Sequence, residues 1–273
     1  MDKKGQDKGQ ITIFVIIAIV IVASILLIYT LYNTGFFDRF LKGGFSSDLN
    51  NIEKNVQDCV DSSLERVIVI NSLQGGYYFV SEPSVYYFSN DSLLSRNIPY
   101  YIDKEYKVPN TQTLRDEISS GLLSEISACL DSEQFVDGPI EIGNALVDLD
   151  FSNYKADVKI LNDRVNVKTY FSVNVNFNET SYLLKEFSSD YKTNYLSLYR
   201  LANNISEIQK QYKDEICLTC IDAVVKENNA QLLNQEFYED NNASYTLIYN
   251  IFKEYPREEK IEVYSFAHKF YSK

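Results

Sequence analysis

The sequence predicts an α+β protein in which helices pack on antiparallel strands, preceded by one N-terminal transmembrane helix. Three observations support this fold class. Residues 11–32 contain no charged side chain, two later segments repeat apolar residues at helical spacing, and residues 139–177 alternate apolar and polar residues. A period near 3.6 indicates a helix with one buried face, and a period of two indicates a half-buried strand. Helices packed on an antiparallel sheet are therefore the expected architecture.

The apolar run at residues 11–32 has the length of a membrane span. As a helix it would measure about 33 Å, which matches a hydrocarbon core about 30 Å thick. Tyr29 and Tyr32 lie at the end of the run, where amphipathic rings favour the membrane interface. The run is longer than the apolar part of a cleaved secretory signal, and no small-residue cleavage site follows it. We therefore expect the run to stay in the membrane as an anchor and to contact the lipid bilayer directly.

The orientation of the span follows from the basic residues around it. Lys3, Lys4 and Lys8 precede the run, and Arg39 and Lys42 follow it. The excess of positive charge before the span predicts a cytoplasmic N-terminus. The expected organisation is a cytoplasmic tail (1–10), a transmembrane helix (11–32), a juxtamembrane linker (33–51) and an extracytoplasmic α+β domain (52–273). The expected localisation is the cell membrane.

The composition restricts the partners of the domain. The net charge of −12 argues against nucleic-acid binding, which requires a basic surface. Four Asn-x-Ser/Thr sequons lie in the domain and agree with its placement outside the cytoplasm. These candidate glycosylation sites are Asn90, Asn178, Asn204 and Asn242.

Two amphipathic helices are expected in the domain. The first begins near Ile52 and ends at "QGG", because Gly75 or Gly76 can adopt the left-handed conformation after a helix. The second begins near Thr111 or Thr113, either of which could cap it. The predicted buried stripes are Ile52, Val56, Val60, Leu64, Val67 and Ile68 in the first helix, and Leu114, Ile118, Leu122, Ile126 and Leu130 in the second.

The remaining segments have less regular patterns. Two aromatic runs flank "SEPS", so a hairpin is expected between them, and the two prolines of the next segment predict irregular structure. The expected elements are a hairpin at 77–88, irregular structure at 96–110, an antiparallel meander at 139–177 with a turn at Asn162-Asp163, helical structure at 180–230 and a closing hairpin at 244–270.

The four cysteines are expected to form structural disulfides. Three pairings are open, and we favour Cys59–Cys129 and Cys217–Cys220, because the first two lie beside the apolar faces of helices that could pack together. Two alternatives use the same residues. A Cys₄ zinc site would need all four, and "CLTC" at Cys217 and Cys220 could support thiol exchange. Since neither alternative has the usual supporting residues, no metal or cofactor is expected.

Other candidate residues have simpler structural interpretations. His268 is the single histidine, and no Ser or Cys signature accompanies it, so a structural role is expected. The segment "QGGYYFV" could offer tyrosines to a ligand, but a helix end followed by a strand explains it equally well. The acidic segments lack the spacing of a calcium-binding loop. No catalytic site is therefore predicted, and the protein is not expected to be an enzyme.

The start of the chain resembles the class III, prepilin-like signal of archaeal surface proteins. The residues that carry the resemblance are "KGQITIF", in which Lys8 and Gly9 precede Gln10. The resemblance implies cleavage between Gly9 and Gln10. Phe14 stands where the pattern has a glutamate that helps pilin subunits assemble, so a standard filament is not expected. The "KKGQ" start and the Cys59 helix before "QGGY" further resemble archaeal single-pass envelope proteins, a group that implies no particular activity.

These observations predict a membrane-anchored cell-envelope protein with an outward-facing binding, adhesion or structural domain. Its expected partners are the lipid bilayer and either an envelope protein or a glycan. One alternative is a type IV pilin-like subunit cleaved after Gly9. A second is an envelope thiol oxidoreductase that uses Cys217 and Cys220.

Overall fold

The computed structural model describes residues 46–87, 95–132, 140–142, 145–177, 180–212, 216–240, 244–255 and 260–271. The chain divides into two compact units, residues 1–51 and 52–273. The predicted span and the candidate cleavage site at Gly9 and Gln10 lie outside the described residues. Within the described ranges, no helix is both long enough and apolar enough to cross a membrane.

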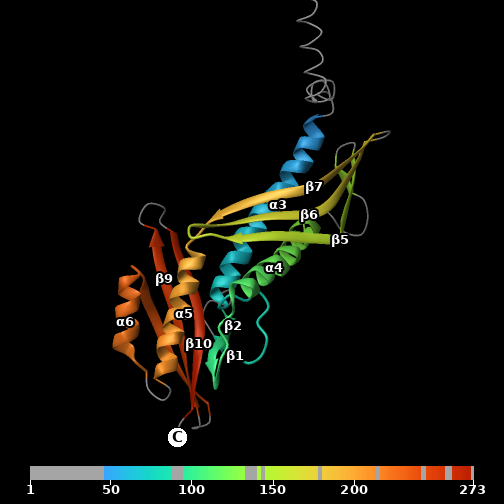
Figure 1. The fold of residues 1–273 in the computed structure, drawn as a ribbon. Coiled ribbons are helices and arrows are strands. Elements are labelled where there is room, and N and C mark those ends of the chain that lie inside the picture. Colours follow the sequence, from blue (N-terminus) through green and yellow to red (C-terminus); the bar gives the residue numbers. More distant parts are fainter. Residues whose placement is uncertain are drawn as a thin grey trace, which may run out of the picture. The chain divides into compact units, whose positions relative to one another are not determined.

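The part of the chain that the structure describes contains four helices (Figure 1). They are α3 (Ser46–Leu73), α4 (Thr111–Ser132), α5 (Tyr195–Gln211) and α6 (Leu218–Glu227). The first two are the predicted amphipathic helices, and every residue of both predicted stripes is buried. Because α3 begins at Ser46, the end of the predicted linker is helical.

The ends of these helices refine the sequence predictions. Gly75 and Gly76 both have positive φ angles, of 58° and 86°, and they end α3 as expected. The cap of α4 is Asn110, whose side-chain oxygen accepts hydrogen bonds from the N–H groups of Gln112 and Thr113 at 2.9 Å. The prediction of a threonine cap was therefore wrong, because the asparagine immediately before the helix already satisfies those donors.

A four-stranded antiparallel sheet has the strand order β4-β5-β6-β7. Its strands are β4 (Ile140–Ile142), β5 (Ala145–Ile160), β6 (Arg164–Phe177) and β7 (Thr180–Lys192). The predicted meander and its turn are confirmed. The helical prediction for the start of 180–230 was wrong, because Phe187 and Ser189 lie two residues apart, pair with the buried side of β6 and are themselves buried.

A six-stranded sheet is built from segments at both ends of the domain. Its strand order is β1-β2-β10-β9-β8, and β3 pairs with the C-terminal end of β2. The strands are β1 (Ser84–Tyr87), β2 (Arg96–Asp103), β3 (Glu105–Tyr106), β8 (Gln231–Asp240), β9 (Ser244–Tyr255) and β10 (Lys260–Tyr271). The pair β2–β10 is parallel and the others are antiparallel. The predicted closing hairpin is confirmed as β9 and β10.

Two predictions fail in this sheet. The first aromatic run does not pair with the second, because β1 pairs with β2 instead. The segment predicted to be irregular is largely β2 and β3. Pro99 is tolerated in β2 opposite Ser84, near the edge of the sheet, and the apolar side chains of Ile98 and Tyr101 are fully buried. Burial of these side chains therefore favours the strand in spite of the proline.

Tyrosine hydroxyls connect the elements around this sheet. The Tyr101 hydroxyl on β2 donates to the Gly75 carbonyl at 2.9 Å and lies 2.8 Å from the Tyr264 hydroxyl on β10. Tyr199 on α5 donates to the Pro109 carbonyl at 2.6 Å. Burial raises the pKa of Tyr101 and of Tyr264 well above the usual value, so both hydroxyls keep their protons. Among the described residues, six of the 22 tyrosines are buried in the core: Tyr100, Tyr101, Tyr195, Tyr199, Tyr249 and Tyr264.

Candidate functional site

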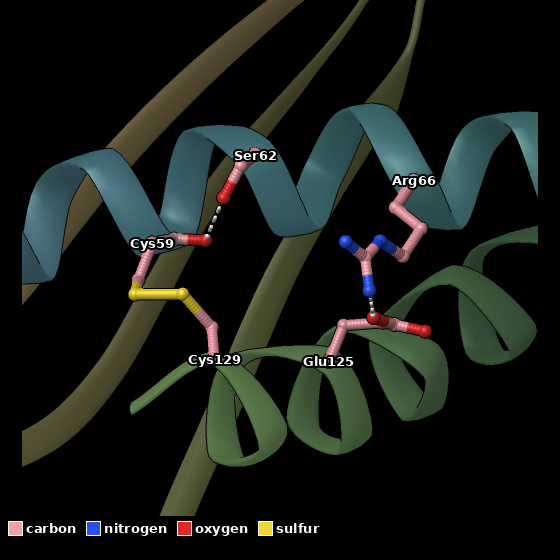
Figure 2. Close-up of a disulfide and its surroundings, with 5 residues drawn as sticks. All are labelled: Cys59, Ser62, Arg66, Glu125 and Cys129. Carbon is pink, nitrogen blue, oxygen red and sulfur yellow. Dashed lines mark hydrogen bonds and ion pairs between the residues drawn. A yellow bond between two sulfur atoms is a disulfide. The ribbon is translucent and has the colours of Figure 1, made fainter. Parts of the chain in front are cut away.

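The structure joins Cys59 on α3 to Cys129 on α4 in a disulfide, with the two Cα atoms 5.8 Å apart (Figure 2). This is the pairing favoured from the sequence. Two turns further along α3, Arg66 faces Glu125 of α4 with 3.3 Å between the charged atoms. Because the Arg66 side chain is 69% exposed, this ion pair stabilises the helix contact by at most about 1 kcal/mol. The covalent bond is the stronger link between the two helices.

The second disulfide joins Cys217 and Cys220 at the start of α6. Both residues are half-buried. Leu218 and Tyr212 beside them are 49% and 42% exposed. None of the cysteines is free, and the described residues contain no cluster of His, Cys, Asp or Glu suited to a metal ion. The zinc alternative is not supported, because oxidised cysteines supply no thiolate ligands.

The "QGGYYFV" segment lies against α4. The Glu117 carboxylate accepts hydrogen bonds from the backbone N–H groups of Tyr78 and Phe79, at 2.9 and 3.1 Å. The Tyr78 hydroxyl donates to Glu125 at 2.6 Å. Burial, followed by this hydrogen bond, raises the pKa of Tyr78 to about 12. The segment therefore serves mainly to attach the end of α3 to α4, although Phe79 remains 59% exposed.

His268 is fully buried on β10. Its Nε2 atom lies 2.9 Å from the Ser206 hydroxyl of α5, and its Nδ1 atom has no hydrogen-bond partner among the described residues. The rings of Tyr249, Phe266 and Phe270 surround it. Burial lowers the pKa of His268 to about 3, so the ring is neutral at physiological pH. The geometry agrees with the structural role expected from the sequence.

One candidate glycosylation site falls within the described residues. Asn204 is exposed on α5, whereas the hydroxyl of Ser206, the third residue of its sequon, is buried and donates to the Ala202 carbonyl. The other three sequon asparagines, Asn90, Asn178 and Asn242, lie outside the described residues. The structure therefore presents one of the four asparagines at the surface of a helix.

Two hollows flank the four-stranded sheet. One, of about 920 Å³, lies between α4 and strands β5 to β7, and the other, of about 600 Å³, lies between α3 and β7. Polar side chains beside the larger hollow are hydrogen-bonded to one another, since Lys168 donates to Glu186 and Asn166 donates to Asp190, both at 2.5 Å.

A third hollow, of about 340 Å³, has a more distinctive lining. It lies where the β2–β3 turn, the last turn of α5 and the end of β10 meet, and we call it the lysine–tyrosine hollow. Its lining consists of Ile102, Lys104, Glu105, Tyr106, Gln209, Lys210, Lys269, Phe270 and Tyr271. Three elements that are distant in the sequence therefore each contribute a lysine to one concave surface.

The lysines of this hollow lie close to tyrosine rings. The Nζ atom of Lys104 is 4.8 Å from the centroid of the Tyr271 ring, and that of Lys210 is 4.7 Å from the centroid of the Tyr106 ring. Lys269 lies 5.9 Å from the Tyr271 ring. An ammonium group within about 6 Å of a ring centroid is attracted by the negative face of the ring. The rings therefore hold the lysine head groups beside the hollow.

Sequence reasoning did not find the lysine–tyrosine hollow. Its residues are dispersed over three segments, and no periodic pattern connects them. One local signal is present, because "KEY" and "KFY" both place a lysine two residues before a tyrosine, at Lys104–Tyr106 and Lys269–Tyr271. In extended chain, residues two apart point to the same side. The rule places Lys269 and Tyr271 on one face of β10, but it does not apply to Lys104, which lies in the β2–β3 turn with a φ angle of +57°.

The described residues thus define an α+β protein with two disulfides and one concave surface that combines lysines with tyrosines. No family model, curated protein or solved structure matches the chain. The resemblance of its start to class III signals therefore stays a prediction, and its function has to be inferred from its own residues.

Proposed function

We propose that the protein is a membrane-anchored envelope protein, in which residues 11–32 form the anchor and residues 52–273 form an extracytoplasmic domain for binding, adhesion or structure. The observation that carries this proposal is the disulfide between Cys59 and Cys129. Disulfides persist in oxidising compartments and are rare in the cytosol. The uncharged run and the three lysines before it support the same placement.

The proposal is tested by the topology of the full chain in intact cells. We expect the protein to remain in the membrane fraction after carbonate extraction and its domain to be cleaved by protease added outside. We expect its cysteines to react with maleimide only after reduction. Recovery in the soluble fraction, protection from external protease or four thiols reactive without reduction would contradict the proposal.

A matched pair of variants separates anchoring from folding. Replacing Ile19 and Ile21 with lysine should release the protein from the membrane, since each central lysine costs about 3 kcal/mol of insertion free energy. Replacing the same residues with leucine should leave membrane anchoring unchanged. If both variants anchored equally well, residues 11–32 would not be the span.

The pilin-like alternative is distinguished by the mature N-terminus. Cleavage after Gly9 would leave Gln10 as the first residue, and N-terminal sequencing or intact mass would show it. A mature chain that begins at Met1 or Asp2 excludes a cleaved subunit. Cleavage alone would not establish a filament, because Phe14 occupies the position of the glutamate used in assembly.

Thiol exchange at Cys217 and Cys220 is a second candidate function. The observation in its favour is the half-buried disulfide at the start of α6, with the exposed side chains of Leu218 and Tyr212 beside it. A helix N-terminus stabilises a thiolate on its first residue. A substrate dithiol would be oxidised to a disulfide as this pair is reduced to two thiols. Equilibration with a glutathione buffer tests it: a reduction potential below about −300 mV indicates a structural bond instead.

A further inference from the structure

The hollow between α3 and β7, which we call the acidic hollow, is lined by carboxylates and hydroxyl groups. The carboxylates of Asp58, Asp61, Glu65 and Asp190 border it, and the other described residues of its lining are three serines and one tyrosine. Ionised carboxylates only accept hydrogen bonds, and hydroxyl groups can accept them too. The volume of about 600 Å³ lies within the range of small-molecule sites. The lining therefore favours a small ligand that carries positive charge and many donors.

Three of the four carboxylates keep an unmatched negative charge. Asp190 pairs with Arg164 at 3.3 Å, so its charge is already compensated. Asp58, Asp61 and Glu65 form no ion pair among the described residues. These three side chains are therefore the principal sources of negative potential in the acidic hollow.

Two lysines near the acidic hollow do not cancel this charge. Lys260 donates to the hydroxyl of Tyr191 at 2.7 Å, but it also pairs with Glu262 at 3.3 Å. Lys54 is exposed one helical turn before Asp58, and it forms no ion pair among the described residues. Three carboxylates thus stand against one lysine that has no acidic partner, so the excess of charge is negative.

A buried hydroxyl group of the lining is a second, independent sign of a ligand. Ser189 is only 8% exposed, and it pairs with the buried Val167 across the sheet. Its hydroxyl has no hydrogen-bond partner among the described residues, whereas most buried polar side chains have one. Ser189 lines both the acidic hollow and the larger hollow beside α4. A donor on a ligand would satisfy the Ser189 oxygen.

The wall of the acidic hollow is fixed by its own hydrogen bonds. The Gln57 side-chain amide on α3 donates to Asp61 and to the Ser188 carbonyl of β7, both at 2.9 Å. The Tyr191 hydroxyl on β7 donates to Glu65 at 3.5 Å. These donors are neutral, so they connect α3 with β7 without removing the negative charge.

The spacing of the carboxylates selects among cations. Asp58, Asp61 and Glu65 are three and four residues apart, so they share one face of α3 and are about 4.5 and 6 Å apart along its axis. The described residues contain no acidic cluster suited to a single metal ion. An extended chain gains about 1.2 Å per bond, so ammonium groups separated by four and five bonds lie about 5 and 6 Å apart. Spermidine has this arrangement of three ammonium groups.

We propose that the acidic hollow binds a linear polyamine of the spermidine class, with its ammonium groups along Asp58, Asp61 and Glu65 and with Ser189 as a further acceptor. The inference rests on the proposed function, in which the domain binds a partner. It goes further by naming the chemical class of the ligand and the residues that select it.

The test compares four probes on the purified full chain in detergent, by calorimetry or by ligand-observed NMR. The probes are spermidine, butylammonium, the magnesium ion and trilysine, which present respectively the spaced charges, one charge, a compact double charge and a basic peptide. We expect spermidine to bind at least about tenfold more tightly than butylammonium, because three ion pairs replace one. Spermidine should also bind more tightly than magnesium or trilysine, whose charges do not match the row of carboxylates.

Variants locate the site. Asp58→Asn and Glu65→Gln should each weaken spermidine binding about threefold or more, the effect of one exposed ion pair. Ser189→Ala should weaken it about twofold or more without a change of charge. Lys54→Gln should strengthen it, because a repelling charge is removed. The matched control is Glu227→Gln, at an exposed position of α6, which should leave binding unchanged.

Each alternative outcome overturns the inference in a recognisable way. Equal affinities for spermidine and butylammonium would mean that the spacing is not read, and equal affinities for spermidine and magnesium would indicate a general acidic surface. Tighter binding of trilysine would assign the hollow to a basic protein segment. No binding of spermidine, or equal losses in Asp58→Asn and Glu227→Gln, would remove the site. None of these outcomes affects the topology experiment, so the failure of this inference is distinguishable from the failure of the proposed function.

Discussion

Cys59 and Cys129 are 70 residues apart in the sequence, and their disulfide joins the middle of α3 to the last turn of α4. Both residues lie beside the buried stripes of their helices. The bond therefore closes a loop that contains the end of α3, the "QGGYYFV" segment, strands β1 to β3 and nearly all of α4. Its effect on the unfolded chain should be large, because loop-closure entropy grows with loop length.

Removal of this disulfide should lower the stability of the domain substantially. For a loop of this length, the chain-entropy relation predicts a loss of about 4 kcal/mol in the free energy of unfolding for Cys59→Ala with Cys129→Ala. Urea unfolding under oxidising conditions measures the loss. The control is Cys217→Ala with Cys220→Ala, whose short loop predicts only about 1.5 kcal/mol. Similar losses for the two double variants would contradict the loop-length argument.

Glu117 should be required to hold the segment after α3 in place. Glu117→Ala removes the acceptor of the Tyr78 and Phe79 N–H groups, and we expect a loss of about 1–3 kcal/mol in the free energy of unfolding. Amide hydrogen exchange at these two residues should accelerate more than elsewhere in the domain. Glu117→Gln keeps one acceptor oxygen and should have a smaller effect. Unchanged exchange in Glu117→Ala would show that the two bonds are not maintained in solution.

Gly75 is a position where a side chain should be strongly destabilising. A Cβ atom there would lie 2.8 Å from Pro99 Cγ and 2.9 Å from the Ser265 carbonyl oxygen, and the φ angle is +58°. We expect Gly75→Ala to lower the free energy of unfolding by about 2 kcal/mol or more. Asn229 also has a positive φ angle, of 50°, but it is exposed. Asn229→Ala should therefore cost only about 1 kcal/mol, and equal losses would show that crowding contributes nothing.

His268 should make the stability depend on pH below neutrality. Its pKa is lowered to about 3 in the folded protein, whereas an unfolded histidine has a pKa near 6.5. The unfolded state therefore binds a proton first, so the full stability holds above pH 6.5 and declines as the pH falls from 6.5 toward 3. The loss should reach about 2 kcal/mol at pH 5.

Urea unfolding between pH 7 and pH 5 measures this effect, in a range where most carboxylates remain ionised. The control is His268→Gln, which cannot titrate and whose amide can approach the Ser206 hydroxyl. Its stability should vary less over the same range. An equal pH dependence in the two proteins would mean that other groups are responsible.

The helices α3 and α4 could be predicted in detail because their apolar residues recur over more than four turns. Every residue from Ile52 to Ile68 in the first stripe, and from Leu114 to Leu130 in the second, is buried as expected. The pairing of Cys59 with Cys129 followed from the same stripes. A long amphipathic pattern specifies both the element and its buried face, so few alternatives remain.

The strands β2 and β7 could not be predicted so well, because their structure depends on distant partners. Pro99 and Pro109 suggested irregular structure, yet β2 lies between β1 and β10, and its apolar residues are buried by elements from both ends of the domain. In β7, the alternation around Phe187 is short and is interrupted by a register shift against β6. The tendency of a segment to form a strand depends on its neighbours more strongly than the tendency to form a helix does.

The lysine–tyrosine hollow could not be predicted either, because it too depends on contacts between distant segments. Lys104, Lys210 and Lys269 belong to segments separated by more than fifty residues each, and only the parallel contact of β10 with β2 brings Lys269 near Lys104. Paired lysine and tyrosine residues are common on protein surfaces. Without the sheet order, nothing in the sequence identifies these pairs as parts of one site.

The parallel pairing of β2 with β10 also determines when the domain can be completed during synthesis. A ribosome adds roughly 160 residues between the two strands, which takes on the order of 10 to 30 s. During that time the apolar side chains of β2 lack the neighbour that completes their sheet. α3 and α4 have already been made, so Cys59 and Cys129 can be oxidised first. The disulfide-linked pair of α3 and α4 is therefore expected to form first, and the six-stranded sheet is completed later, when β10 pairs with β2.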